Sequence, residues 1–379
     1  MQKRRDPSQP QRRPRIRLLA CAIALAATGC YEDGPRPRTP EQTRAQLLRL
    51  LPVTLDDRAG WAGDIQVALT SMELDASDAN LCAVLAVTEQ ESTYVANPAV
   101  PGLGRIARTE IEDRAAGKGV PRFMVRAAMQ IDAPNGQTWD ARIGAVRTEK
   151  ELSDIFEELT DRVPMGRRLF ANANPVRTGG PMQVSIAFAE AHARDRTYPH
   201  GVVGSIRHEV FTRHGGMYFG IAHLLDYPAS YTKPLFRFAD FNAGRYASRN
   251  AAFQNAVAVA TGIPLDLDGD LIRHGKDASA SNPSATEAAV RTMATSMQMS
   301  VDEIARDLRQ SHRNGFEESR LYRQVYALGD QRNGRALPRA TLPRIRLESP
   351  KITRKLTTEW FATRVDRRWR NCMARAARG

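Results

Sequence analysis

Apolar residues recur along much of this chain at the three-to-four-residue spacing of amphipathic helices, which predicts a mainly α-helical fold. Residues 81–98 are central to this prediction. They begin as an apolar run, end in a polar Glu-Gln-Glu-Ser sequence, and stop at Pro98, because the residue before a proline disfavours helical geometry. Polar residues at 75–78 supply candidate N-caps. We expect a helix that is buried for two turns and then presents a carboxylate at the edge of a cleft.

Two glutamates near the end of this helix are candidates for that carboxylate. At about 100° per residue, Glu91 lies beyond Val84 and Val87, whereas Glu89 lies beyond side chains that are smaller on average. An apolar setting raises the pKa of a carboxyl group, as a general acid at neutral pH requires. The pattern favours Glu91 modestly, and the alternative that both glutamates are solvated at a helix end stays open.

Further periodic segments predict helices on both sides of this stretch. They cover residues 39–51, 57–72, 105–119, 149–162, 185–195, 205–214, 217–225, 247–261, 283–309 (two helices), 316–328 and 353–375. Residues 337–350 contain three prolines and are expected to be extended. The last helix is basic and amphipathic, and packing of its aromatic face on the core is favoured over a role at a membrane surface.

Two later motifs add chemistry to the stretch at 81–98. Residues 180–183 read Gly-Pro-Met-Gln, and residues 239–244 read Ala-Asp-Phe-Asn-Ala-Gly; each is predicted to open a helix. A Glu-Ser at a helix end, then Gly-x-Met-Gln, then an aromatic-Asn-Ala-Gly is the ordered motif set of lytic transglycosylases with the goose-lysozyme-like fold. The chain resembles that superfamily over roughly residues 75–263.

The resemblance implies a lysozyme-like core and a role for each matched residue. Glu91 would protonate the glycosidic oxygen between N-acetylmuramic acid and N-acetylglucosamine, and would then act as a base on the sugar's own 6-hydroxyl, which leaves a 1,6-anhydro end. One carboxylate serves both steps, unlike the usual two-carboxylate glycosidase scheme. The other matched residues would shape the binding site for glycan strands: Ser92, Met182, Gln183, Phe241 and Asn242.

Three departures from the motif set keep a second class of function open. Four residues separate Ser92 from the Asn-Pro pair that usually follows closely, a long insertion places Met182 91 residues after Glu91, and Phe241 replaces a tyrosine. The alternative is an envelope lipoprotein that keeps the fold, binds or scaffolds peptidoglycan, and lacks the chemistry. A buried Glu91 that faces a groove would favour the enzyme, and a blocked groove would favour the scaffold.

The N-terminus carries an export pattern. Seven basic residues precede the apolar residues 18–27, which are too few to span a bilayer. The following Ala-Thr-Gly-Cys resembles a bacterial lipobox, so residues 1–29 are expected to be removed and Cys30 to carry lipid; an ordinary signal peptide is the alternative. An aspartate directly after the lipidated cysteine would signal retention in the inner membrane. Tyr31 occupies that position, so the outer membrane is the favoured location. Together with the insertion and a C-terminal Ser-Pro-Lys segment, the lipobox resembles a family of proteobacterial lipoproteins known only as a domain of unknown function.

The charge of the chain depends on this processing. The whole chain carries a formal charge of +13, and removal of residues 1–29 leaves +7. A moderately basic surface suits attraction to peptidoglycan carboxylates or to anionic headgroups. Nucleic acid is not expected as a partner, because no binding motif for it is recognisable and the periplasm contains little of it. No cofactor or metal is expected: the acidic run at 266–270 lacks the spacing and terminal glutamate of a calcium loop.

Two cysteines remain after processing, and an even number in an oxidising compartment predicts a disulfide between Cys82 and Cys372. Such a bond would attach the last helix to the helix of Glu91, and Cα atoms more than about 7 Å apart would exclude it. The expected organisation is a tether, a lysozyme-like domain with an insertion along one wall of a groove or simply packed on the core, and a C-terminal helical region packed on that domain. Their expected ranges are 30–40, 41–265 with the insertion at about 105–175, and 266–379.

Overall fold

The computed structural model describes residues 37–162, 174–273, 282–347 and 354–378. Regular structure in these ranges is almost entirely helical, which confirms the prediction of a mainly α fold. Two short antiparallel pairs of strands accompany the helices, β1 (Thr178–Gly179) with β2 (Val184–Ser185) and β3 (Arg346–Leu347) with β4 (Leu356–Thr357). Cys30, the lipobox and most of the expected tether lie outside the described residues.

Helices occur at every segment predicted to be helical, although three helices rather than two occupy residues 283–309, and the helices at residues 122–129, 139–145 and 234–243 were not predicted. The helices are α1 (Pro40–Leu50), α2 (Arg58–Ser71), α3 (Asp78–Ser92), α4 (Leu103–Ala116), α5 (Arg122–Met129), α6 (Trp139–Ala145), α7 (Glu149–Asp161), α9 (Ile186–Asp195), α10 (Ile206–Val210), α11 (Arg213–Leu225), α12 (Pro234–Ala243), α13 (Ala247–Thr261), α14 (Ala285–Arg291), α15 (Ala294–Met297), α16 (Val301–Leu308), α17 (Arg320–Asn333) and α18 (Thr358–Ala376), with a 3-10 turn η2 (Asn314–Phe316). No helix among the described residues is long and apolar enough to cross a bilayer.

The buried apolar side chains of the described residues form two clusters. The first cluster draws on α1–α4, α6, α7, α9–α12 and α18. The second is built from α13–α17 and the loops between them, and it begins at Phe253. The chain therefore leaves the first cluster after α12 and returns to it with α18, where Phe361 and Val365 are buried. Periodicity shows which face of a helix is apolar but not which core receives that face.

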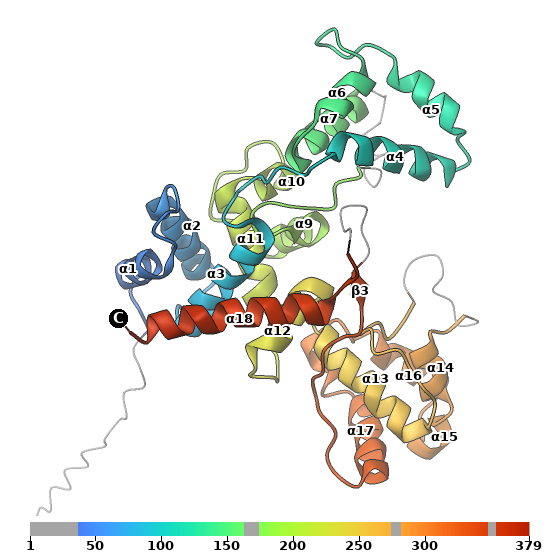
Figure 1. Cartoon of the computed structure of the whole chain (residues 1–379). Helices are drawn as coiled ribbons and strands as arrows, with labels where there is room; N and C mark the ends of the chain where they lie inside the picture. The colour runs from blue at the N-terminus through green and yellow to red at the C-terminus, as the bar shows by residue number, and fades with distance from the viewer. Residues whose placement is uncertain (1–36, 163–173, 274–281, 348–353, 379) are drawn as a thin grey trace, which may run out of the picture. The chain divides into compact units, whose positions relative to one another are not determined.

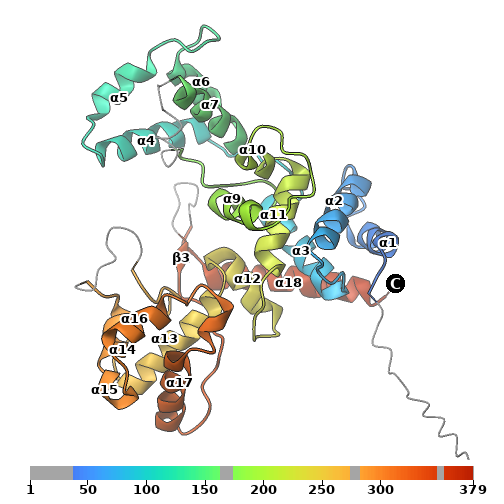
Figure 2. The same cartoon turned by 180° about the vertical axis from the view of Figure 1, so that it is seen from behind.

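α3 is a buried helix of the first cluster. Every side chain from Leu81 to Thr88 is buried, and the hydroxyl of Ser77 caps the start of the helix. The helix ends at Ser92, earlier than Pro98 had predicted, because Thr93 and Tyr94 adopt positive φ. The Tyr94 hydroxyl then turns back and donates to the carbonyl oxygen of Leu85 at 3.0 Å. α18 runs along both α3 and α12 (Figures 1 and 2).

A disulfide joins α18 to α3. Cys82 and Cys372 are bonded, with their Cα atoms 5.5 Å apart, which lies within the limit for a disulfide. Close by, the indole N–H of Trp369 donates to the carbonyl oxygen of Ala79 at 3.0 Å. The last helix is thus attached to the first half of α3 by a covalent bond and a hydrogen bond, and its aromatic face packs on the core as expected.

Two local predictions around glycines were wrong. Gly215 and Gly216 lie inside α11 rather than between two helices, and the hydroxyl of Thr212 caps the start of α11 at Arg213. A side chain at Gly216 would overlap Pro181, so this glycine serves close packing. The Phe-Asn-Ala-Gly motif ends α12 at Gly244 rather than opening a helix, because the glycine adopts a φ of 109°.

Candidate active site

The two glutamates in the last turn of α3, Glu89 and Glu91, lie near different charged residues. Oε1 of Glu89 lies 3.2 Å from Nε of Arg368 on α18, and the adjacent Gln90 accepts a hydrogen bond from the same guanidinium at 2.8 Å. The charged neighbour of Glu91 is instead Glu149, the first residue of α7. Glu89 therefore belongs to the contact between α3 and α18, whereas Glu91 is turned toward the insertion.

Glu91 lies in surroundings that favour its protonated form. Burial, and then repulsion from the Glu149 carboxylate, raise the pKa of Glu91 from 4.5 to about 8. Within the described ranges its carboxyl group makes no hydrogen bond or ion pair, and its side chain is only partly exposed. A carboxyl group in this state holds its proton at neutral pH and can deliver it to a substrate, as a general acid must.

Backbone contacts join the start of α7, where Glu149 lies, to the segment that follows α3. The amide of Val100, which follows α3, donates to the carbonyl oxygen of Arg147 at 2.8 Å, and Ala99 forms an isolated β-bridge with Thr148. Glu149 itself is only 6% exposed. It was not among the residues predicted from the sequence, because nothing in the spacing of the chain pairs position 91 with a helix that begins more than fifty residues later.

The Gly-Pro-Met-Gln motif forms the turn between β1 and β2, so the predicted helix begins only at Ile186. Gly180 has a φ of 73°, and a side chain there would overlap the carbonyl oxygen of Val210. The side chain of Gln183 makes two hydrogen bonds inside the turn, both at 3.3 Å. Its Oε1 accepts from the Thr178 hydroxyl, and its Nε2 donates to the carbonyl oxygen of Gly180. The turn is therefore fixed by its own side chains.

One side of α11 contacts α3, which carries the Glu-Ser motif, and residues of both later motifs. Met217 Sδ lies 3.8 Å from the Thr88 hydroxyl of α3, and the fully buried Met182 packs on Gly220, where an added Cβ would lie 2.5 Å from its sulfur. The ring of His223 lies 5.2 Å from that of Phe241. Positions 217, 220 and 223 are three residues apart, so they share one side of the helix. α11 is the element on which the Glu-Ser helix, the turn and the Phe-Asn motif meet.

The remaining predicted residues use their polar groups within the fold. The hydroxyl of the buried Ser92 donates to the carbonyl oxygen of Thr88 at 3.2 Å. Oδ1 of Asn242 accepts from the hydroxyl of Thr358 at 2.9 Å, which ties the end of α12 to the start of α18. Phe241 is only 8% exposed. Glu91 differs from these residues, because its carboxyl group has no such partner among the described residues.

A cavity of about 650 Å³ lies beside the β1–β2 turn. Residues 156–161 of α7 line one side of it, and residues 185–190 and part of α10 line the other. At 1.5 Å per residue, Glu149 and Phe156 are about 10 Å apart along α7. The C-terminal half of α7 thus forms one wall of this cavity. The N-terminal end of the same helix carries Glu149, the charged neighbour of Glu91.

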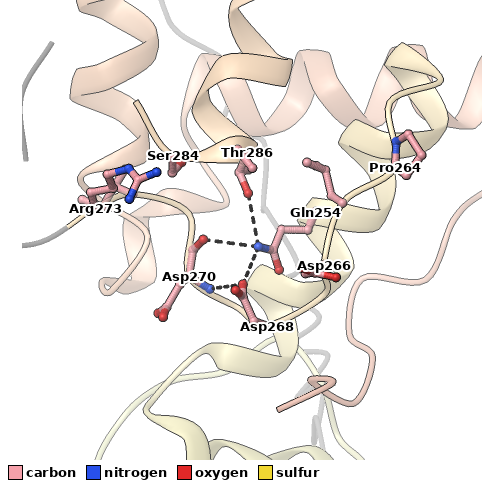
Figure 3. Close-up of a pocket in the computed structure, with 11 residues that line it drawn as sticks. Gln254, Pro264, Asp266, Asp268, Asp270, Arg273, Ser284 and Thr286 are labelled. Carbon is pink, nitrogen blue, oxygen red and sulfur yellow. Dashed lines mark hydrogen bonds between the residues drawn. The ribbon is translucent and has the colours of Figure 1, made fainter. Parts of the chain in front are cut away.

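The acidic run at 266–270 serves the second cluster. Oδ1 of Asp268 accepts from Nε2 of Gln254 at 2.7 Å and from the amide of Asp270 at 2.9 Å (Figure 3). These bonds brace a cavity of about 550 Å³ whose lining also includes Thr286. Across the part of the chain that the structure describes, no three His, Cys, Asp or Glu side chains are grouped so that they could hold a metal ion.

Comparison with known proteins gives two matches and one negative result. Residues 54–375 match a family described as protein of unknown function (DUF1615). Over 359 residues the chain is 50% identical to the uncharacterized protein YaiW of Escherichia coli strain K12, and the match covers 94% of this chain and 97% of that protein. No solved structure matches.

Proposed function

The chain belongs to the DUF1615 family, and we propose that it is a cell-envelope lipoprotein that cleaves peptidoglycan as a lytic transglycosylase, with Glu91 as its acid and base. The observation that carries the proposal is the state of Glu91. Its pKa is raised to about 8 by burial and by a neighbouring carboxylate, and no cation neutralises it among the described residues. A carboxyl group kept neutral at a helix end is what proton donation to a glycosidic oxygen needs.

The packing on α11 supports a lysozyme-like core as part of this proposal. Thr88 on the helix that carries the Glu-Ser motif, Met182 of the second motif and Phe241 of the third contact one helix at Met217, Gly220 and His223. Their convergence favours the interpretation that the motifs form one structural unit.

The proposed reaction uses Glu91 twice. Protonated Glu91 gives its proton to the oxygen between N-acetylmuramic acid and N-acetylglucosamine, and the bond from that oxygen to the muramic acid carbon breaks. The resulting carboxylate then accepts the proton of the sugar's 6-hydroxyl as that oxygen attacks the same carbon. The products are a 1,6-anhydro end and a free 4-hydroxyl, so water takes no part and Glu91 regains its proton.

A muropeptide digest tests this function. Purified protein incubated with intact sacculi should release muropeptides that end in 1,6-anhydromuramic acid, because the attacking oxygen belongs to the sugar. Mass spectrometry separates them from hydrolysis products, which contain one more water. Reducing ends would show a hydrolase. Binding to sacculi without any release would instead support a scaffolding lipoprotein, an alternative favoured by the engagement of Ser92 and Asn242 within the fold.

Lipid attachment at Cys30 is a separate part of the proposal. The basic and apolar segments before Cys30 and the small residues next to it predict cleavage after residue 29 and acylation of the cysteine. The intact mass of protein extracted from membranes should equal the chain from Cys30 onward plus a diacylglyceryl group on the sulfur, with or without a third acyl chain on the amine. Cys30→Ser should abolish that added mass and release the protein from outer-membrane fractions. A mature chain that starts at another residue would contradict the prediction.

A further inference from the structure

We propose that the exposed basic face of α18 docks on an anionic phospholipid surface and so orients the anchored protein on its membrane. This face comprises Arg367 and Arg370, together with Arg378 just beyond the end of the helix. The inference rests on the lipid anchor of the proposed function for the bilayer that the face meets, and it is independent of the proposed chemistry at Glu91.

The net positive charge of the mature chain is concentrated in this segment. Residues 354–378 include eight basic and two acidic residues, a formal charge of +6, whereas the whole chain from Cys30 onward carries +7. The two acids are Glu359, in the first turn of α18, and Asp366, which pairs with Arg370 at 2.6 Å. Among the described residues, the side chains of Arg367 and Arg378 make no ion pair or hydrogen bond, so their charges are available to a partner.

Packing on the core and contact with a membrane use opposite sides of α18. Phe361, Val365 and Cys372 are buried in the first cluster. At about 100° per residue, Arg367 and Arg370 point about 120° or more away from each of these positions. The Arg370 side chain stays 72% exposed despite its bond to Asp366. Because the core already covers the aromatic face of the helix, the contact with lipid is electrostatic rather than an insertion into the bilayer.

The described chain begins beside this helix. Arg38 donates to the carbonyl oxygen of Ala76, just before α3, at 2.7 Å, and Trp369 of α18 is bonded to the first turn of the same helix. The end of α18 also lies beside α1 in both views (Figures 1 and 2), where Arg375 donates to the carbonyl oxygen of Leu50 at 3.3 Å. The entry of the chain and the end of α18 therefore occupy the same side of the first cluster.

The position of the anchor favours phospholipid over peptidoglycan carboxylates as the partner of this face. Seven residues separate Cys30 from Pro37, and a fully extended chain of that length spans at most about 25 Å. A lipid on Cys30 thus keeps this side of the molecule close to a bilayer, where anionic headgroups attract arginines. Docking of the exposed face would place α18 between the bilayer and α3.

Vesicle sedimentation of the mature chain, residues 30–379 produced without lipid, tests the face apart from the anchor. Vesicles of phosphatidylcholine mixed with phosphatidylglycerol should bind the protein, vesicles of phosphatidylcholine alone should bind it much less, and high salt should release it. Arg367→Gln/Arg378→Gln should weaken binding to the mixed vesicles by about 30-fold, because each arginine near an anionic surface contributes about five-fold. Both side chains are exposed, so their replacement should leave the fold intact.

Arg323→Gln/Arg335→Gln is the matched control. It removes the same charge from exposed positions in and just after α17, so vesicle binding should stay within a few-fold of the wild type. Equal losses in the two double variants, or no loss in either, would overturn the inference. It would also be overturned if Arg367→Gln/Arg378→Gln lost binding to sacculi but kept binding to vesicles, because the partner would then be peptidoglycan. Vesicle binding through these arginines by a protein that releases no muropeptides would uphold the inference and reject the transglycosylase.

Discussion

Glu91→Gln should lower the turnover of peptidoglycan by at least about 10²-fold, the usual scale of a lost general acid and base. Glutamine keeps the shape of the side chain but has no proton of suitable acidity to give and cannot accept one afterwards. The initial rate of muropeptide release from sacculi is the measurement. Glu89→Gln is the matched control, because Glu89 lies in the same turn but pairs with Arg368. Its activity should stay within a few-fold of the wild type.

A stability measurement shows whether Glu91→Gln remains intact. The pKa of Glu91 is higher in the folded chain than its usual value of 4.5, so the folded state binds more protons than the unfolded state between pH 4.5 and about 8. The free energy of unfolding therefore falls as pH rises through that window. Glutamine does not titrate, so the variant should lack this decline and gain relative stability toward pH 8. Full activity in a folded Glu91→Gln protein would show that Glu91 is not the acid and base of the reaction. Loss of activity in Glu89→Gln instead would indicate that Glu89 has that role.

Replacement of both bonded cysteines should cost the most stability of any change considered. The bond between Cys82 and Cys372 closes a loop of 290 residues, and the chain-entropy model gives about 5.7 kcal/mol as an upper figure for such a loop. Denaturant unfolding of Cys82→Ala/Cys372→Ala, compared with the oxidised wild type, measures the loss. The reduced wild type is the control, and it should lie close to the double variant. A loss below about 1 kcal/mol would show that the bond contributes little.

Much of the fold and part of the site could be predicted from the sequence, and the limits have physical causes. The helices were visible because amphipathic spacing is a local property. Membership of a family of unknown function also followed from whole-chain features. The early end of α3 was not visible, because it depends on Tyr94 reaching Leu85. Glu149 was missed for the same reason: a single glutamate gains meaning only when tertiary contacts bring it to Glu91.

The motif positions show the same contrast. Gly180 was singled out as part of a motif, but the sequence could not show that this segment is a turn between strands rather than a helix start. Asn242 was expected to help shape the glycan-binding site, and the structure records its bond to Thr358 of α18. Residue identity thus predicted where special backbone or polar groups occur. Their partners required the packing of distant segments.

The return of α18 to the first cluster makes the order of synthesis matter. The helix that carries Glu91 is made early, but one of its faces is covered by a helix that begins at Thr358, and its cysteine finds its partner at Cys372. During synthesis or secretion, the apolar face of α3 that packs on α18 therefore stays exposed until α18 is available. A protein truncated before α18 would carry every matched motif and yet lack the element that completes their core. The proposed enzyme would thus gain its mature form only when its last helix arrives.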